Sequence, residues 1–91
     1  MRQIARIIST LEREAHIWEK HRVTRDEVEE ACFNEPLVVR GREGCHVVLG
    51  QTEAGRYLHV VVVLMNRGRA RLITARDVTP QERRYYQRRG K

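Results

Sequence analysis

The sequence lacks a long apolar run, a signal-like amino terminus and the short motifs of several common enzyme classes. No stretch approaches the roughly 20 apolar residues that a membrane-spanning helix requires. Charges interrupt the first residues, MRQIARIISTLERE, which argues against a secretory signal. A glycine-rich phosphate loop, a GxSxG elbow and a credible carboxylate pair are also absent. We therefore expect a soluble cytoplasmic protein with no membrane partner.

Metal-binding motifs are missing as well. The two cysteines, Cys32 and Cys45, form no CxxC motif, and the four histidines lack HxxxH spacing. A free cysteine usually behaves as a small buried apolar residue, so we expect Cys32 on a helix face and Cys45 on a strand. We predict neither a metal site nor a cofactor.

Two histidines fall on predicted strands and need a geometric check. A turn centred on Ala54-Gly55 would pair His46 with Val63 and His59 with Gly50. The two imidazoles would then lie roughly 13 Å apart, at about 3.4 Å per residue. They could not share a metal ion, and we interpret each as an ordinary strand residue.

The chain has a net charge of +6 that is unevenly distributed over its 91 residues. Residues 1–36 hold six Lys/Arg and eight Asp/Glu, a net charge of −2, whereas residues 37–91 hold twelve and four, a net charge of +8. Such asymmetry favours a basic face turned toward a polyanion such as nucleic acid. A generally arginine-rich surface would explain the charge equally well.

Two helices are expected in the first third of the chain. Ser9 and Glu12 form a capping box before LEREAHIWEKH, in which Leu11, Ala15 and Trp18 line one side, with Trp18 as a core anchor. A second capping box, Thr24 with Glu27, opens TRDEVEEACF, whose apolar side is Val28, Ala31 and Cys32. The segment 34–36 ends that helix, because the residue before Pro36 is pushed away from the α region. Residues 3–8 fit a short strand or an early helical turn.

From residue 37 the pattern changes to strands separated by turns. Four strands are expected at 37–40, 45–50, 57–65 and 69–75, with turn signals between them. The run 57–65 is apolar on both alternating faces, which predicts a strand in the middle of the sheet. Thr79, Pro80 and Glu82 then announce a final helix over RRYYQRRGK, with Gly90 as its stop. We predict one α+β domain over residues 1–91, an antiparallel meander sheet packed against two amino-terminal helices, with a short carboxy-terminal helix.

Cationic and aromatic side chains gather where the last strand meets the final helix. Alternation places Arg69 and Arg71 on the sheet face opposite Arg76, which would share its face with the helix. Arginine binds phosphate bidentately, and tyrosine stacks on bases or donates its hydroxyl. A ribonuclease that uses no metal must hold the phosphate, orient the ribose 2′-hydroxyl and stabilise the developing charge. His21, at the end of the first helix, could exchange a proton near neutral pH.

In these elements the sequence resembles the BrnT family of bacterial type II toxins, small proteins with a RelE-like fold. The resemblance covers about residues 15–86 in the right order. The matching motifs are Lys20-His21-x-Val23-Thr24, Glu27-x-x-Glu30-x-x-Phe33, Pro36, Leu49-Gly50-Gln51-Thr52-x-x-Gly55-Arg56-x-Leu58 and Ile73-Thr74-Ala75-Arg76-Asp77-x-Thr79-x-x-Glu82-Arg83-x-x-Tyr86.

The resemblance implies a toxin that cleaves RNA and is neutralised by a BrnA-like DNA-binding antitoxin, through which alone operator DNA would be contacted. It implies function at four matched positions. We expect Arg76 and Arg83 to bind the scissile phosphate, Tyr86 to orient the substrate and His21 to act as an acid or base. Further RNA contacts are expected from Arg56, Arg69, Arg71, Arg84, Arg88 and Arg89.

Two hypotheses stay open. The first is an endoribonuclease toxin that needs no metal. The second is a non-catalytic RNA- or partner-binding module on the same scaffold. The family commonly places tryptophan and aspartate where this chain has Ser9-Thr10, and that departure favours the second hypothesis.

Overall fold

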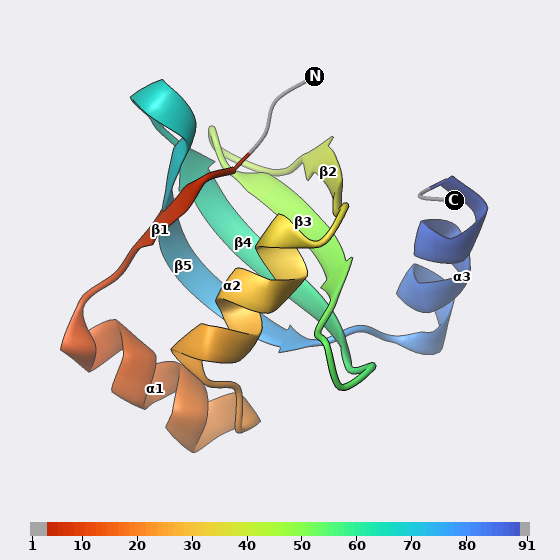
Figure 1. Cartoon of the computed structure of the whole chain (residues 1–91), viewed down its shortest axis with the longest axis horizontal. Coiled ribbons are helices and arrows are strands. Elements are labelled where there is room, and N and C mark those ends of the chain that lie inside the picture. Colours follow the sequence, from red (N-terminus) through yellow and green to blue (C-terminus); the bar gives the residue numbers. More distant parts are fainter. Residues whose placement is uncertain (1–3, 90–91) are drawn as a thin grey trace.

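The computed structural model describes residues 4–89, which form a five-stranded sheet with three α-helices (Figure 1). Across the sheet the strand order is β1-β5-β4-β3-β2. The α+β class, the helix pair before the sheet and the final helix are confirmed. Along the chain the elements are β1 (Arg6–Ile8), α1 (Leu11–His21), α2 (Arg25–Phe33), β2 (Leu37–Arg40), β3 (His46–Gln51), β4 (Tyr57–Leu64), a 3-10 turn η1 (Asn66–Gly68), β5 (Arg69–Asp77) and α3 (Pro80–Arg89).

The first segment is a strand, and it makes the sheet mixed. The strands β2 to β5 form the predicted antiparallel meander, whereas β1 pairs with β5 in parallel. A parallel pair of strands needs a long crossover connection. Here the connection from β1 to β5 contains all the elements between them, beginning with α1 and α2. Gln3, which we included in the first segment, lies outside the described residues.

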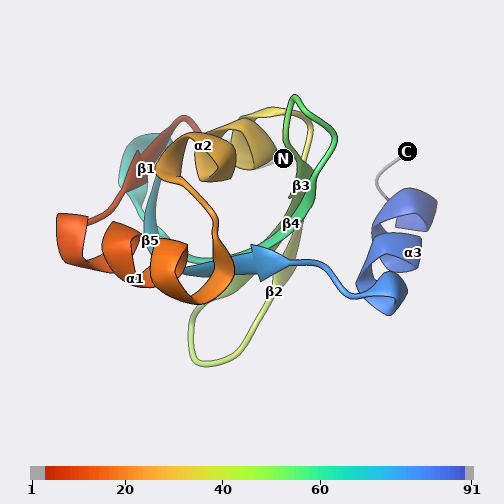
Figure 2. The ribbon, with the colours of Figure 1, turned by 90° about the horizontal axis from the view of Figure 1, so that it is seen from below.

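The main core lies between α2 and one face of the sheet (Figure 2). As predicted, Val28, Ala31 and Cys32 form the buried side of α2. Burial raises the pKa of the Cys32 thiol to about 12, so this cysteine is an inert core residue. Gly50 on β3 permits the close approach, because a Cβ there would lie 2.1 Å from the carbonyl oxygen of Ala31.

The strand β4 is central in the sheet but is buried on one face only. Leu58, Val60 and Val62 are fully buried beneath the helices. Val61 and Val63, which point to the opposite face, are half-buried. The predicted two-sided burial is therefore wrong, since the buried residues of α1 and α2 cluster with Leu58, Val60 and Val62 on the first face. The sequence alternation alone does not reveal which face a helix will cover.

The first helix has the predicted bounds but a different cap and a different buried side. Thr10, not Ser9, is the N-cap, and its hydroxyl accepts a hydrogen bond from the Arg13 N–H at 3.0 Å. Ile17 is the buried residue of α1, whereas Leu11 and Trp18 are 83% and 47% exposed. Trp18 is not a core anchor; it stacks under the guanidinium of Arg22 at 5.1 Å.

The hairpin register differs by one residue from the prediction. His46 pairs with Val62 and His59 pairs with Leu49. Since paired residues share a face, His46 lies on the helix-covered face with Val62, and His59 lies on the opposite face. Cys45 directly precedes β3 instead of belonging to it.

A β-bulge in β5 changes which arginines lie together. Val61 pairs with Thr74 and Val62 with Leu72, so one extra residue, Ile73, is inserted. The insertion shifts the alternation, and Arg71, Thr74 and Arg76 all lie on the face away from α2. The expectation that Arg71 and Arg69 face away from Arg76 is wrong for this reason.

Candidate active site

The junction between β5 and α3 holds Arg76 in a fixed position. Thr79 caps α3, and Glu82 completes the predicted capping box, because its carboxylate accepts from the Thr79 N–H at 2.9 Å. The same carboxylate binds Arg76 bidentately, with N–O distances of 3.0 and 2.9 Å. The pair is only partly exposed, 35% for Arg76 and 27% for Glu82. Arg76 lowers the pKa of Glu82 to about 2, so the carboxylate is charged at neutral pH.

His59 lies directly across the sheet from Arg76. The two residues are register partners in β4 and β5, and the His59 Nε2 atom is 3.7 Å from the Glu82 carboxylate. Burial, and then the charge of Arg76, lower the pKa of His59 below its usual range. The imidazole is therefore neutral at pH 7 and can accept a proton. Sequence reasoning missed this residue, since only the register and the bulge together bring it beside Arg76.

Two tyrosines and Arg83 form a wall next to Arg76 and His59. The rings of Tyr57 and Tyr86 meet edge to face at a centroid distance of 5.8 Å. Arg83 lies over the Tyr57 ring at 4.3 Å and remains exposed to solvent. Tyr86 is only 4% exposed, which places it in the packing between α3 and the sheet.

An open groove of about 450 Å³ runs past this wall. It is bordered by Tyr57, the connection 77–80 and the arginines Arg83 and Arg84. The groove therefore joins an aromatic ring to two exposed guanidinium groups. That combination suits a nucleotide, whose base stacks and whose phosphate is anionic.

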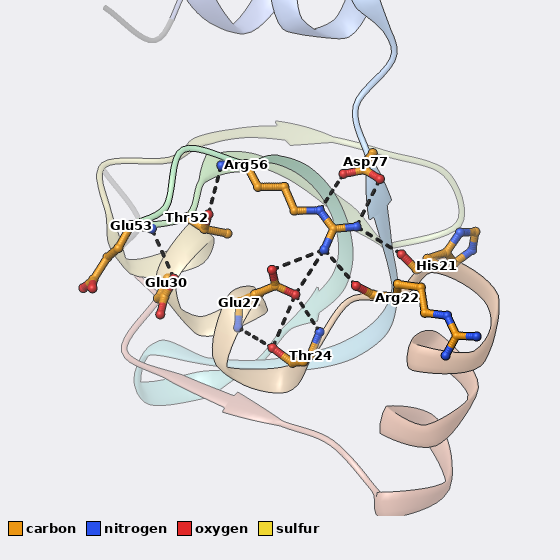
Figure 3. A network of polar contacts seen from close by, with 9 residues as sticks. All are labelled: His21, Arg22, Thr24, Glu27, Glu30, Thr52, Glu53, Arg56 and Asp77. Carbon is orange, nitrogen blue, oxygen red and sulfur yellow. Dashed lines mark hydrogen bonds and ion pairs between the residues drawn. The ribbon is translucent and has the colours of Figure 1, made fainter.

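Arg56 occupies a different position from the other candidate arginines. Its guanidinium joins Asp77 at 2.7 Å, Glu27 at 3.2 Å and the carbonyls of His21 and Arg22 at 3.1 and 2.8 Å (Figure 3). All three of its nitrogens donate within the protein. The interactions with Asp77 and Glu27 raise the pKa of Arg56. This network ties the end of α1, the start of α2 and the end of β5 together.

His21 belongs to that network and not to the Arg76 cluster. Figure 3 shows its carbonyl directed at Arg56, with the imidazole turned away from Glu27. Its charge acts on Asp77, whose pKa is lowered mainly by the hydrogen bond from Arg56. Because Asp77 and Arg76 alternate along β5, the structure places His21 and Arg76 on different sides of the strand.

The remaining predicted arginines are spread over two places. Arg71 and Arg69 lie at the start of β5, five and seven residues before Arg76, or roughly 16 and 23 Å along the strand. The others are exposed on α3 (Arg84, Arg88 and Arg89), and Arg89 covers the Tyr85 ring at 5.5 Å. The structure thus places Arg83 and Arg84 at the groove and Tyr86 against Tyr57. Arg76 is bound to Glu82 of the same helix, whereas His21 and Arg56 belong to another cluster. In the described residues no group of three or more His, Cys, Asp or Glu side chains could hold a metal ion.

Comparison with known proteins identifies the fold. No family model matches the sequence, and no curated protein matches it either. The structure is similar to the crystal structure of the ribonuclease toxin BrnT from Brucella abortus, with a TM-score of 0.68. The match covers 81% of this chain and 96% of that one at 16% sequence identity. The chain has a BrnT-like fold. In the part that the structure describes, no helix is long and apolar enough to cross a membrane.

Proposed function

We propose that this chain is an endoribonuclease that acts as the toxin of a bacterial type II toxin–antitoxin system. The observation that carries the proposal is the cluster at the β5–α3 junction, where Arg76 and His59 are register partners and Arg83 lies over Tyr57 at the border of an open groove. Its BrnT-like fold is that of a protein described as a ribonuclease toxin. We further propose that RNA is the substrate, that a BrnA-like antitoxin is the partner and that the protein acts in the cytoplasm.

The chemistry needs only side chains of this cluster. Neutral His59 accepts the proton of a ribose 2′-hydroxyl, and the 2′-oxygen attacks the adjacent phosphorus. The bond from phosphorus to the 5′-oxygen breaks, and the leaving oxygen takes a proton from water. The products are a 2′,3′-cyclic phosphate and a 5′-hydroxyl. Arg76 and Arg83 stabilise the charge that develops on the phosphate oxygens.

Glu82 limits the access of a phosphate to Arg76. Its carboxylate occupies the guanidinium fork that a phosphate would bind. An RNA phosphate must share the Arg76 guanidinium with the Glu82 carboxylate or displace it. Arginine binds both phosphate and carboxylate groups bidentately, so either arrangement is possible. Tyr57 offers its ring to a base, and Tyr86 positions Tyr57 from behind.

Proton transfer is tested by replacing each histidine in turn. His59→Gln should reduce cleavage about a hundredfold, the usual contribution of a general base. His21→Gln should change cleavage little, because His21 lies with Arg56. In the parent, the rate should rise with pH and level off below the usual histidine pKa, since that of His59 is lowered. A larger loss of cleavage in His21→Gln than in His59→Gln would show that His21, beside Arg56, is the general base.

The proposal as a whole is tested with purified chain, labelled RNA and EDTA in the buffer. We expect fragments that end in a 2′,3′-cyclic phosphate, growth arrest on expression and rescue by a co-expressed DNA-binding protein encoded by a neighbouring gene. Protein freed of any bound partner that leaves RNA intact would refute the ribonuclease.

A non-catalytic binding module is the second candidate. The occupied fork of Arg76 favours it, because a resting ion pair with Glu82 is also an ordinary structural contact. The Ser9-Thr10 departure favours it too. This candidate predicts RNA binding without cleavage, which the same assay distinguishes.

A further inference from the structure

The sheet face that points away from α2 carries a compact apolar area, which we call the valine patch: Val39, Val47, Val61 and Val63. The strand register places Val39, Val47 and Val61 in one row across β2, β3 and β4, and Val63 lies two residues further along β4. All four are half-buried. The helix α3 lies at one end of the sheet (Figure 2), where Tyr86 packs on Tyr57.

The border of the valine patch is cationic. Arg71 is the register partner of Val63, and Arg76 belongs to the row next to Val61. The bulge at Ile73 is what brings both arginines onto this face. The rows of the patch contain no carboxylate, and Glu82, which lies beyond the next row, is bound to Arg76. An occupant therefore meets aliphatic surface in the middle, the exposed guanidinium of Arg71 on the β5 side and the Arg76–Glu82 ion pair in the next row.

An aliphatic surface bordered by arginine suits some classes of occupant and not others. RNA would gain nothing from aliphatic side chains, because it binds through phosphate contacts and stacking. A second copy of the chain would offer the same valines and no carboxylate from the rows of the patch, so the arginines beside the patch would gain no anionic partner there. A segment with aliphatic residues on one side and carboxylates beside them satisfies both parts of the surface.

We propose that the valine patch is the docking surface for an acidic amphipathic segment of another protein. Its aliphatic side packs on Val47 and Val61, and its carboxylates pair with Arg71 and Arg76. A segment seated there also engages Arg76, so it would compete with an RNA phosphate; this last step rests on the proposed function. The patch would then be the place where a partner switches the site off.

The test uses synthetic peptides of about 18 residues, long enough for five turns of helix. One peptide carries leucine on one helical face and glutamate elsewhere, a second has the same composition shuffled, and a third replaces glutamate by lysine. We expect the acidic amphipathic peptide alone to bind in a fluorescence-anisotropy titration at low salt. Val61→Glu should weaken binding at least about tenfold through charge repulsion, and the isosteric Val61→Thr should weaken it less.

Leu11→Glu is the matched control, since Leu11 is an apolar residue 83% exposed on α1. It should leave peptide binding unchanged, and thermal melts should show that all three variants fold. Amide shifts in the NMR spectrum should move at Val47, Val61 and Val63. Shifts confined to α1 or α2, equal binding by the shuffled peptide, or no binding would overturn the inference. So would concentration-dependent dimerisation that Val61→Glu abolishes, because the occupant would then be a second copy.

RNA cleavage is measured separately on the same proteins without peptide. Cleavage with no peptide bound at the patch refutes the docking surface and leaves the ribonuclease standing. Peptide binding at the patch by a chain that cleaves no RNA supports the docking surface and refutes the ribonuclease. Binding that leaves cleavage undiminished overturns the switching role.

Discussion

Arg56 and Arg76 look alike in the sequence, yet the structure gives them different surroundings. Each guanidinium nitrogen of Arg56 donates to Asp77, Glu27 or a carbonyl at the end of α1. We propose that Arg56 holds the fold together and does not bind RNA. Its partners come from three elements, so its loss would loosen the base on which β5 rests.

The Arg56 assignment predicts a change in stability. Arg56→Lys keeps the charge but loses the planar fork, and should lower the free energy of unfolding by about 2–3 kcal/mol. Arg71→Lys, on an exposed position of the same sheet, should change it by less than about 0.5 kcal/mol. Urea denaturation measures both. Equal stabilities would show that the Arg56 network contributes little.

Glu82 predicts a pH dependence at the candidate site. Its pKa is lowered from 4.5 to about 2 by Arg76, so the ion pair stabilises the protein above pH 4.5 and is lost as pH falls toward 2. Since both side chains are about one third exposed, solvent screens the pair to about 1 kcal/mol. Glu82→Gln should be less stable than the parent at pH 7, and the difference should vanish near pH 2. A difference that persisted at pH 2 would mean that the loss has another cause, such as packing of α3.

At the scale of elements, the packing of α2 on β3 depends on Gly50. A Cβ there would meet the backbone of Ala31, which cannot move aside as a side chain could. Gly50→Ala should therefore destabilise the protein by at least about 2 kcal/mol. The control is Gly44→Ala, at a turn with a φ of +79° and no atom near a new Cβ, which should cost about 1 kcal/mol from backbone strain alone. Thermal melts that ranked Gly44→Ala as the worse variant would contradict this packing.

The elements also show what a sequence can and cannot reveal. Capping residues and turn glycines act locally, so α2, α3 and the meander could be predicted from residues such as Thr24 and Thr79. The bulge at Ile73 has no local signal, because it depends on how β4 and β5 pair. The same is true of Ile17, which is buried only because β5 lies beneath that side of α1. For the same reason the sequence does not show that His59 lies beside Arg76, whereas the place of Arg76 before a capped helix follows from local signals.

At the scale of the whole molecule, the charge is concentrated in residues 37–91, which include the groove and the arginines of α3. We predict that RNA affinity falls steeply with salt, because phosphate contacts release counterions. Three or four such contacts to a single strand would lose roughly 20- to 50-fold between 50 and 200 mM salt. Changing Arg88 and Arg89 together to alanine should weaken binding and leave cleavage intact. An RNA affinity that did not change with salt concentration would contradict the electrostatic account.

The most direct test of the ribonuclease site compares Arg76→Lys with Arg89→Lys. Arg76 is held between the end of β5 and the capped start of α3, whereas Arg89 is exposed near the end of α3. The measurement is the initial rate of cleavage of one labelled RNA by folded proteins whose thermal melts agree. We expect Arg76→Lys to lower the rate by about tenfold or more, since lysine lacks the planar fork, and Arg89→Lys to leave it within about twofold. Folded Arg76→Lys that cleaved RNA as fast as the parent would contradict the assignment of the site.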